Sequence, residues 1–195
     1  MRKYIIAALF AATAASPAFA QTADTAATNL GGFRIEGLVG YETTDIEDEG
    51  TDGLTYGVGV GYDVQSGRTV FGVEAEAMES EIGECVNGVN VTGDTLCAKA
   101  GRDLYVGGRV GAAVGSNALV YAKAGYTNTR FEASYQASAT ATQVSTNEDL
   151  DGVRVGGGVQ FGLGPNLYAK AEYRYSNYEQ GFDKHQGLVG VGFKF

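Results

Sequence analysis

Apolar and polar residues alternate with a period of two along most of this 195-residue chain, from residue 32 to the last residue. This period places successive side chains on opposite faces of a β-strand, and no sustained helical period of 3.6 competes with it. Eight such runs are present, each near the roughly 9 to 11 residues that a tilted membrane strand needs. They are residues 32–43, 53–64, 69–79, 103–114, 119–128, 152–163, 167–176 and 187–195. The pattern predicts an all-β fold.

Short and long connections between the runs alternate strictly. The short ones are rich in Gly, Ser and Asn and have the composition of tight turns, at residues 65–68, 115–118 and 164–166. The other connections are longer and polar, at residues 44–52, 80–102, 129–151 and 177–186. Membrane barrels have this asymmetry, with short periplasmic turns and longer external loops.

The two faces of the runs differ sharply in composition. One face is apolar throughout, as in Phe33, Ile35, Val39 and Tyr41, whereas the other mixes glycine with charges of both signs. A soluble β-sandwich or lipocalin-like barrel is the alternative, but strand glycines facing water would weaken such a sheet without compensation. In the narrow bore of an eight-stranded barrel, glycine makes room for large ionic groups. We therefore predict an eight-stranded antiparallel up-and-down transmembrane β-barrel.

The first residues have the features of an export signal. Arg2 and Lys3 precede an apolar stretch, and Ala18-Phe19-Ala20 forms a small-x-small cleavage site. An uncleaved membrane helix is the alternative, but the apolar stretch is shorter than the roughly 20 residues that span a bilayer. We predict a signal peptide over residues 1–20, a short periplasmic segment over residues 21–31 and a barrel domain over residues 32–195.

Three segments resemble a known family. YAKAEYRYSNY (168–178), YAKAGYTNTRF (121–131) and the ending LVGVGFKF (188–195) are similar to segments of small outer-membrane β-barrel proteins of Gram-negative bacteria. That family, also called the porin family, includes opacity-protein-like surface antigens and the barrel domain of outer-membrane protein A. The resemblance implies residence in the outer membrane among lipid and lipopolysaccharide, without implying an activity.

The resemblance also implies insertion by the barrel assembly machinery. The family presents a C-terminal signal to that machinery, with a terminal Phe preceded by apolar residues at every second position. In this chain the matching residues are Val189, Val191, Phe193 and Phe195.

The charged residues of the inward face are nearly balanced. The face that we predict to point inward carries seven basic and six acidic residues. Because an isolated buried ion is costly, we expect a cross-strand ionic network that fills the lumen, with Glu74 and Glu76 facing Arg109 or Lys123. The alternative is a narrow ion path or gated channel. The expected network comprises Arg34, Glu36, Glu74, Glu76, Arg109, Lys123, Arg154, Lys170, Glu172 and Arg174, with Glu42, Asp103 and Lys194 as further inward charges.

The sequence offers little for catalysis. Acyl-transfer enzymes need a nucleophile beside a base, and the single histidine, His185, has no nearby His-x-Ser arrangement. We expect no enzyme activity and no cofactor, with an envelope lipid-modifying enzyme as the remote alternative. A formal charge of −9 also argues against binding of nucleic acid.

Two external loops carry distinctive residues. Cys85 and Cys97 lie in the second loop, and an exported chain with two cysteines favours a disulfide, which would stabilise by about 3 kcal/mol. The first loop holds six carboxylates over residues 42–52 without Lys or Arg. Oxygen-rich loops can bind Ca²⁺ or Mg²⁺, but no EF-hand spacing is present, so we expect a solvated acidic patch and no metal site.

These observations together predict a structural or surface-interaction barrel that presents its loops to the exterior. A small-solute channel is the alternative. The sequence identifies no partner for the external loops.

Overall fold

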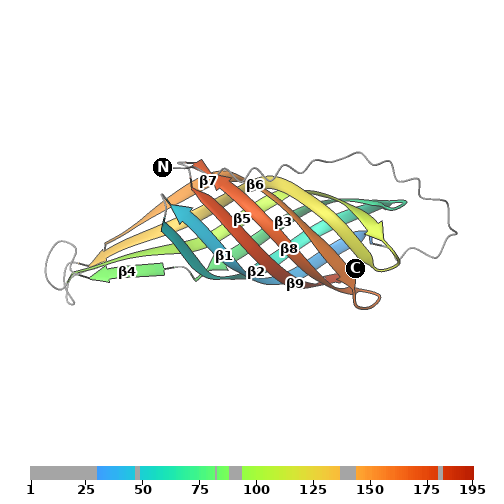
Figure 1. The fold of residues 1–195 in the computed structure, drawn as a ribbon, viewed down its shortest axis with the longest axis horizontal. Coiled ribbons are helices and arrows are strands. Elements are labelled where there is room, and N and C mark those ends of the chain that lie inside the picture. The colour runs from blue at the N-terminus through green and yellow to red at the C-terminus, as the bar shows by residue number, and fades with distance from the viewer. Residues whose placement is uncertain (1–29, 47–48, 82, 88–93, 137–143, 180–181) are drawn as a thin grey trace.

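The computed structural model describes residues 30–46, 49–81, 83–87, 94–136, 144–179 and 182–195, which form an elongated antiparallel barrel (Figure 1). Its strands are β1 (Gly32–Ile46), β2 (Glu49–Ser66), β3 (Thr69–Ser80), β4 (Gly83–Asn87), β5 (Thr95–Val114), β6 (Ala118–Gln136), β7 (Val144–Gly162), β8 (Leu167–Tyr178) and β9 (Asp183–Lys194).

Eight long strands close the barrel, as the sequence predicts. Each strand pairs antiparallel with its neighbours in the order β3-β2-β1-β9-β8-β7-β6-β5, and β3 pairs with β5 to complete the circle. The first and last strands meet along β1 and β9, from Arg34 opposite Lys194 to Asp45 opposite Asp183. The short strand β4 pairs with the outer part of β5 and with no other described strand. Among the described residues, no helix is long and apolar enough to cross a membrane.

The three short connections are tight turns at one end of the barrel. Gly67 and Gly115 take positive φ angles of 60° and 64°, which a glycine adopts without steric cost. The β7–β8 turn is held by a hydrogen bond from the Leu163 amide to the Leu167 carbonyl at 2.8 Å. These turns lie where the sequence places them.

The long connections differ from the sequence prediction, because strands continue into them. β5 begins at Thr95, β6 runs to Gln136 and β7 begins at Val144, well inside the connections predicted over residues 80–102 and 129–151. The apolar period ends where the barrel wall leaves the membrane, since both faces of a strand then meet water. A polar hairpin therefore carries no period-two signal, although its backbone pairing continues.

The apolar face of each strand points outward, away from the lumen. Val58, Val73, Val153 and Tyr173 are between 57% and 65% exposed on this surface. Along each strand, the residues that alternate with these outward side chains point inward, and they are either buried or glycine. An outward apolar face over a closed barrel is the arrangement that a bilayer requires, because lipid replaces the protein core as the partner of the apolar side chains.

Candidate functional site

The lumen of the barrel holds a large set of buried charges. Among the described strand residues, eight basic and seven acidic side chains point inward, and none is more than 8% exposed. Each lies within 3.9 Å of an opposite charge, as a narrow bore requires. The set comprises Arg34, Arg109, Lys123, Arg154, Lys170, Arg174, Lys184 and Lys194 with Glu36, Glu42, Asp63, Glu74, Glu76, Asp103 and Glu172.

Lys123 of β6 lies at the centre of this network. Its Nζ atom is 2.5 Å from a carboxylate oxygen of Glu74, 2.8 Å from Glu76 and 3.1 Å from Glu172. Glu74 and Glu76 come from β3, and Glu172 comes from β8. One ammonium group therefore connects strands from three parts of the barrel wall.

Two cations of β8 extend the network around Lys123. The Lys170 ammonium is 2.7 Å from Glu36 and 3.2 Å from Glu172. The Arg174 guanidinium is 2.9 Å from Glu76 and also pairs with Glu172. Because most of these groups contact two or more partners, no single pair accounts for the neutrality of the centre.

A second part of the network lies toward the short turns. Arg34 pairs with Glu74 and lies 3.4 Å from Asp63, while the Arg109 Nε donates to Asp63 at 2.9 Å. Arg109 and Lys123 stand directly opposite each other on β5 and β6. Like charges in that position repel, and their side chains reach different carboxylates.

A third part lies toward the long hairpins. The Arg154 guanidinium is 2.6 Å from Asp103, and the Lys184 ammonium is 3.3 Å from the same carboxylate. Lys184 also lies 3.8 Å from Glu42, which accepts a hydrogen bond from the Gln186 amide at 2.7 Å. This cluster places charge pairs across β1, β5, β7 and β9.

Tyrosine and glycine complement each other inside the barrel. The ring of Tyr168 lies over Gly192 on the adjacent strand, where an added Cβ would meet the ring carbon Cζ at 2.2 Å. Tyr121 covers Gly158 in the same way, with its hydroxyl 2.8 Å from the position of such a Cβ. The Tyr168 hydroxyl donates to Glu36 at 2.7 Å. Glycine on the inward face therefore makes room for rings that orient the carboxylates.

A buried apolar side chain lies near each end of the barrel. At the short-turn end Leu30 is buried, its amide donates to Gln65 at 2.7 Å, and its carbonyl accepts from the Lys194 ammonium at 2.6 Å. Leu30 packs in a cluster with Val70, Ala113, Leu119 and Tyr121. At the hairpin end Phe182 is buried, with its ring 5.5 Å from that of Tyr178.

The structure places all ten residues of the expected network inside the barrel. Of the two partners expected for Glu74 and Glu76, Lys123 contacts both, whereas Arg109 turns to Asp63. Sequence reasoning missed two lumen charges, Asp63 and Lys184. Asp63 continues the inward period of β2 and is recoverable from it. The predicted last run begins at residue 187 and so leaves out Lys184, whereas β9 begins at Asp183.

Other predicted features fall partly outside the described residues. The signal peptide and most of the segment 21–31 lie outside them and stay predictions, as does the role of the terminal residues 189–195 in assembly.

Cys85 and Cys97 stand directly opposite each other on β4 and β5. Opposed residues of an antiparallel pair have Cα atoms about 4.5 to 5.5 Å apart, a separation that suits a disulfide, which stays a prediction.

The first external loop differs from the prediction at one residue. Glu42, expected to contribute to that loop as well as to the lumen, is 1% exposed and points inward. Side chains 44–50 lie outside the described residues. Within the part of the chain that is described, no group of three potential metal-ligating residues is present.

His185 lies on the outer side of β9. Its Nδ1 is 2.7 Å from the Tyr173 hydroxyl, and its ring centroid is 5.0 Å from that of Tyr175. The surroundings described for this imidazole are thus aromatic.

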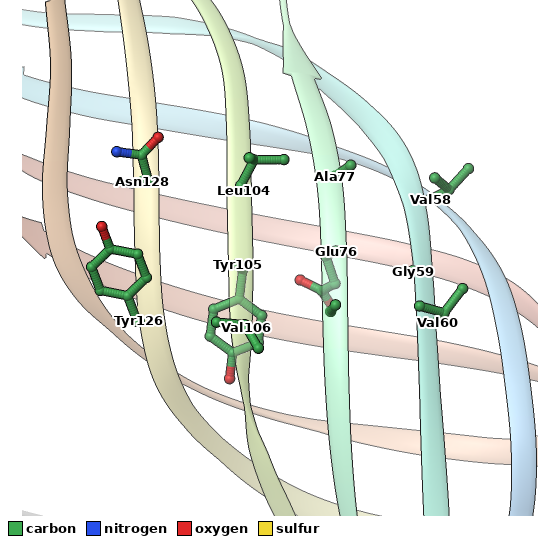
Figure 2. A pocket seen from close by; sticks show the side chains of 11 residues that line it. Val58, Gly59, Val60, Glu76, Ala77, Leu104, Tyr105, Val106, Tyr126 and Asn128 are labelled. Atoms are coloured by element: carbon green, nitrogen blue, oxygen red, sulfur yellow. The ribbon is translucent and has the colours of Figure 1, made fainter.

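The outer wall carries an apolar groove over β3, with a volume of about 590 Å³ (Figure 2). Ala75 and Ala77 of β3 line it together with larger side chains of β2 and β5, and Tyr126 and Asn128 lie at one side (Figure 2). The groove lies in the apolar outer surface of the barrel.

Comparison with known proteins identifies the family. A family model described as an outer membrane protein beta-barrel domain matches residues 5–195. The chain belongs to this family. A 22 kDa outer membrane protein of Rhizobium leguminosarum bv. viciae is 31% identical over 174 residues, covering 81% of this chain and 76% of that protein. This outer-membrane barrel protein therefore resides in the outer membrane of a Gram-negative bacterium.

Solved structures share the fold at low sequence identity. Ail, the attachment invasion locus protein of Yersinia pestis, aligns with a TM-score of 0.60 and 13% identity over 85% of this chain and 99% of Ail. Neisserial surface protein A aligns with a TM-score of 0.57 and 15% identity over 84% of this chain and 97% of that protein. At such identities the likeness concerns the fold alone.

Proposed function

We propose that this protein is a closed surface barrel of the outer membrane, with a structural and surface-interaction role carried by its external hairpins. One observation supports this most strongly. All fifteen charged side chains of the described lumen are buried and paired, so the bore is filled by an ionic network.

A solute path through this lumen would need to separate several of these pairs at once. Removing one partner of a buried ion pair costs about 3 to 5 kcal/mol, because the other charge stays buried. Lys123, Lys170 and Arg174 share carboxylates, so opening the centre disturbs more than one pair. Leu30 and Phe182 add buried apolar side chains near the two ends. The arrangement favours a barrel that does not leak.

Conductance in planar lipid bilayers tests the closed lumen. The purified mature protein is expected to give no stable openings. The double variant Lys123→Ala/Glu76→Ala lacks both partners of one central ion pair and is the matched positive control. This variant is expected to show brief channel openings. Frequent, long-lived openings of the unmodified protein would support the channel alternative and refute the proposal.

The external face is tested separately from the lumen. The partners proposed for the membrane-embedded part are outer-membrane lipid, lipopolysaccharide and the barrel assembly machinery. Shortening the β6–β7 hairpin by removing residues 131–148 should leave membrane integrity unchanged and should alter adhesion of the bacterium to surfaces. Loss of integrity with unchanged adhesion would instead indicate a purely structural role.

A further inference from the structure

Part of the sheet continues past the barrel as an open sheet. From residue 151 toward the hairpin tip, β6 is the one described strand that pairs with β7, because the pairing of β7 with β8 begins at Gly152 opposite Tyr178. β4 and the outer parts of β5 and β6 complete this projecting sheet (Figure 1). Among the described residues, the segment 144–151 of β7 is therefore an edge strand with one unpaired side.

The hydrogen bonds of the two turns show which backbone groups face this edge. The Gly162 amide donates to Asn117 on the β6 side at 2.7 Å, and the Leu163 amide donates to Leu167 on the β8 side at 2.8 Å. Backbone direction alternates along a strand, and the register of β7 with β6 has no shift. Even-numbered residues of β7 thus bond to β6, and odd-numbered residues face the other side. Within 144–151 these are Ser145, Asn147, Asp149 and Asp151.

This edge is open to an added strand. Its eight residues span about 26 Å, enough for a ladder of several hydrogen bonds. The chain has only two prolines, neither of them within residues 144–151, so no proline blocks the ladder. Asn147, whose amide faces this side, is an exposed residue.

The charges beside the edge are predominantly acidic. Asp151, Glu179 and Asp183 are carboxylates at the base of the edge, on β7 and on the β8–β9 hairpin. Asp149 is already paired with Arg130, whose Nε donates at 2.8 Å and holds the pKa of that carboxyl below its usual value. Among the residues that the structure describes, the hydrogen bonds to Asp151 and Asp183 come from neutral groups, including the amides of Asn128 at 2.7 Å and Asn177 at 2.6 Å. An approaching strand therefore meets uncompensated negative charge.

We propose that the free edge of β7, residues 144–151, binds an extended basic segment of another polypeptide by strand addition. Backbone hydrogen bonds from the odd-numbered residues supply the ladder, and the carboxylates select Lys or Arg in the added strand. The proposal rests on the proposed function only in placing the projecting sheet outside the membrane. A second copy of this chain fits poorly, because pairing two such edges would bring their aspartates together.

Peptide binding to the full barrel in phosphatidylcholine nanodiscs tests this inference. The probes are two labelled eight-residue peptides, one alternating Lys and Val and the other alternating Glu and Val, measured by fluorescence anisotropy. Asn147→Pro removes an edge amide that bonds to no described strand, whereas Asn147→Ala keeps it. A gel shift between unheated and heated samples checks that each variant is folded.

We expect the basic peptide to bind the unmodified protein. Its affinity should fall about tenfold in Asn147→Pro, because that variant loses a backbone hydrogen bond and weakens the neighbouring ones. Its affinity should stay nearly unchanged in Asn147→Ala. Isotope-edited infrared spectra of the bound peptide should show β pairing. Three results would each overturn the inference: no binding of the basic peptide, equal binding of both peptides, or equal binding to the proline variant. Dimers formed through this edge would also overturn it. Bilayer conductance is independent of all these readouts, so failure here leaves the closed lumen untouched.

Discussion

Replacing Lys123 by methionine tests the energetics of the lumen most sharply. Its ammonium contacts three carboxylates at 2.5, 2.8 and 3.1 Å, and it is fully buried. Loss of one partner from a buried ion pair costs about 3 to 5 kcal/mol. Each carboxylate keeps another cation, such as Arg34 for Glu74 and Arg174 for Glu76, so we expect the lower end, about 3 kcal/mol.

The free energy of unfolding is measured by urea titration of the barrel refolded into short-chain phosphatidylcholine vesicles. The chain contains no Trp, so far-UV circular dichroism and the heat-dependent gel shift report folding. Arg102→Met is the matched control, because its partner Asp149 lies 3.9 Å away at the surface, where a pair contributes about 0 to 1 kcal/mol.

A double variant separates charge from packing. Adding Glu76→Gln to Lys123→Met removes the excess negative charge that Lys123→Met leaves at the centre, and should recover about 1 kcal/mol. The reasoning is refuted if Lys123→Met unfolds at the same urea concentration as the unmodified protein, with an unchanged slope. It is also refuted if Arg102→Met destabilises equally.

Three further predictions follow from single features. Gly192→Ala should destabilise by about 1 to 3 kcal/mol, because the new methyl group would displace the opposite tyrosine ring, whereas Gly164→Ala in an open turn should have little effect in the same urea titration. Thiol titration in urea without reductant should find no free thiol on Cys85 and Cys97, and two reactive thiols would exclude the disulfide. His185→Ala should leave the lipid A and phospholipid profiles of the outer membrane unchanged, and a changed profile would revive the enzyme alternative.

The sequence predicts the barrel wall well because the membrane imposes a strict rule on it. Lipid outside and a narrow bore inside force every second residue to be apolar, so runs such as 53–64 and 152–163 are visible without a structure. Tight turns with glycine fix the ends of the strands at one side. The phase of each run then assigns most lumen charges correctly.

The hairpins are less predictable, because water on both faces removes the alternation. The outer part of β7, residues 144–151, contains Ser, Thr, Asn, Glu and Asp, which reads as a loop although its backbone pairs with β6. The sequence does not show that Lys184 belongs to the last strand, because its outward neighbours Asp183 and His185 are polar and give no apolar alternation. Pairing preferences within the lumen were also beyond sequence reasoning. Arg109 of β5 contacts Asp63 of β2 because its long side chain extends past the strand between them. The period-two pattern shows which face a residue is on, but it does not show which partner a long side chain contacts.

The orientation of the wall is the central claim, and a single introduced tryptophan tests it directly. Val155 is 51% exposed on the outward face of β7, whereas Asn147 lies on the projecting part of the same strand. In vesicles of brominated phosphatidylcholine, Val155→Trp should be strongly quenched and Asn147→Trp should not. A Val155→Trp signal that escapes bromine but responds to iodide in the water would contradict the lipid-facing wall.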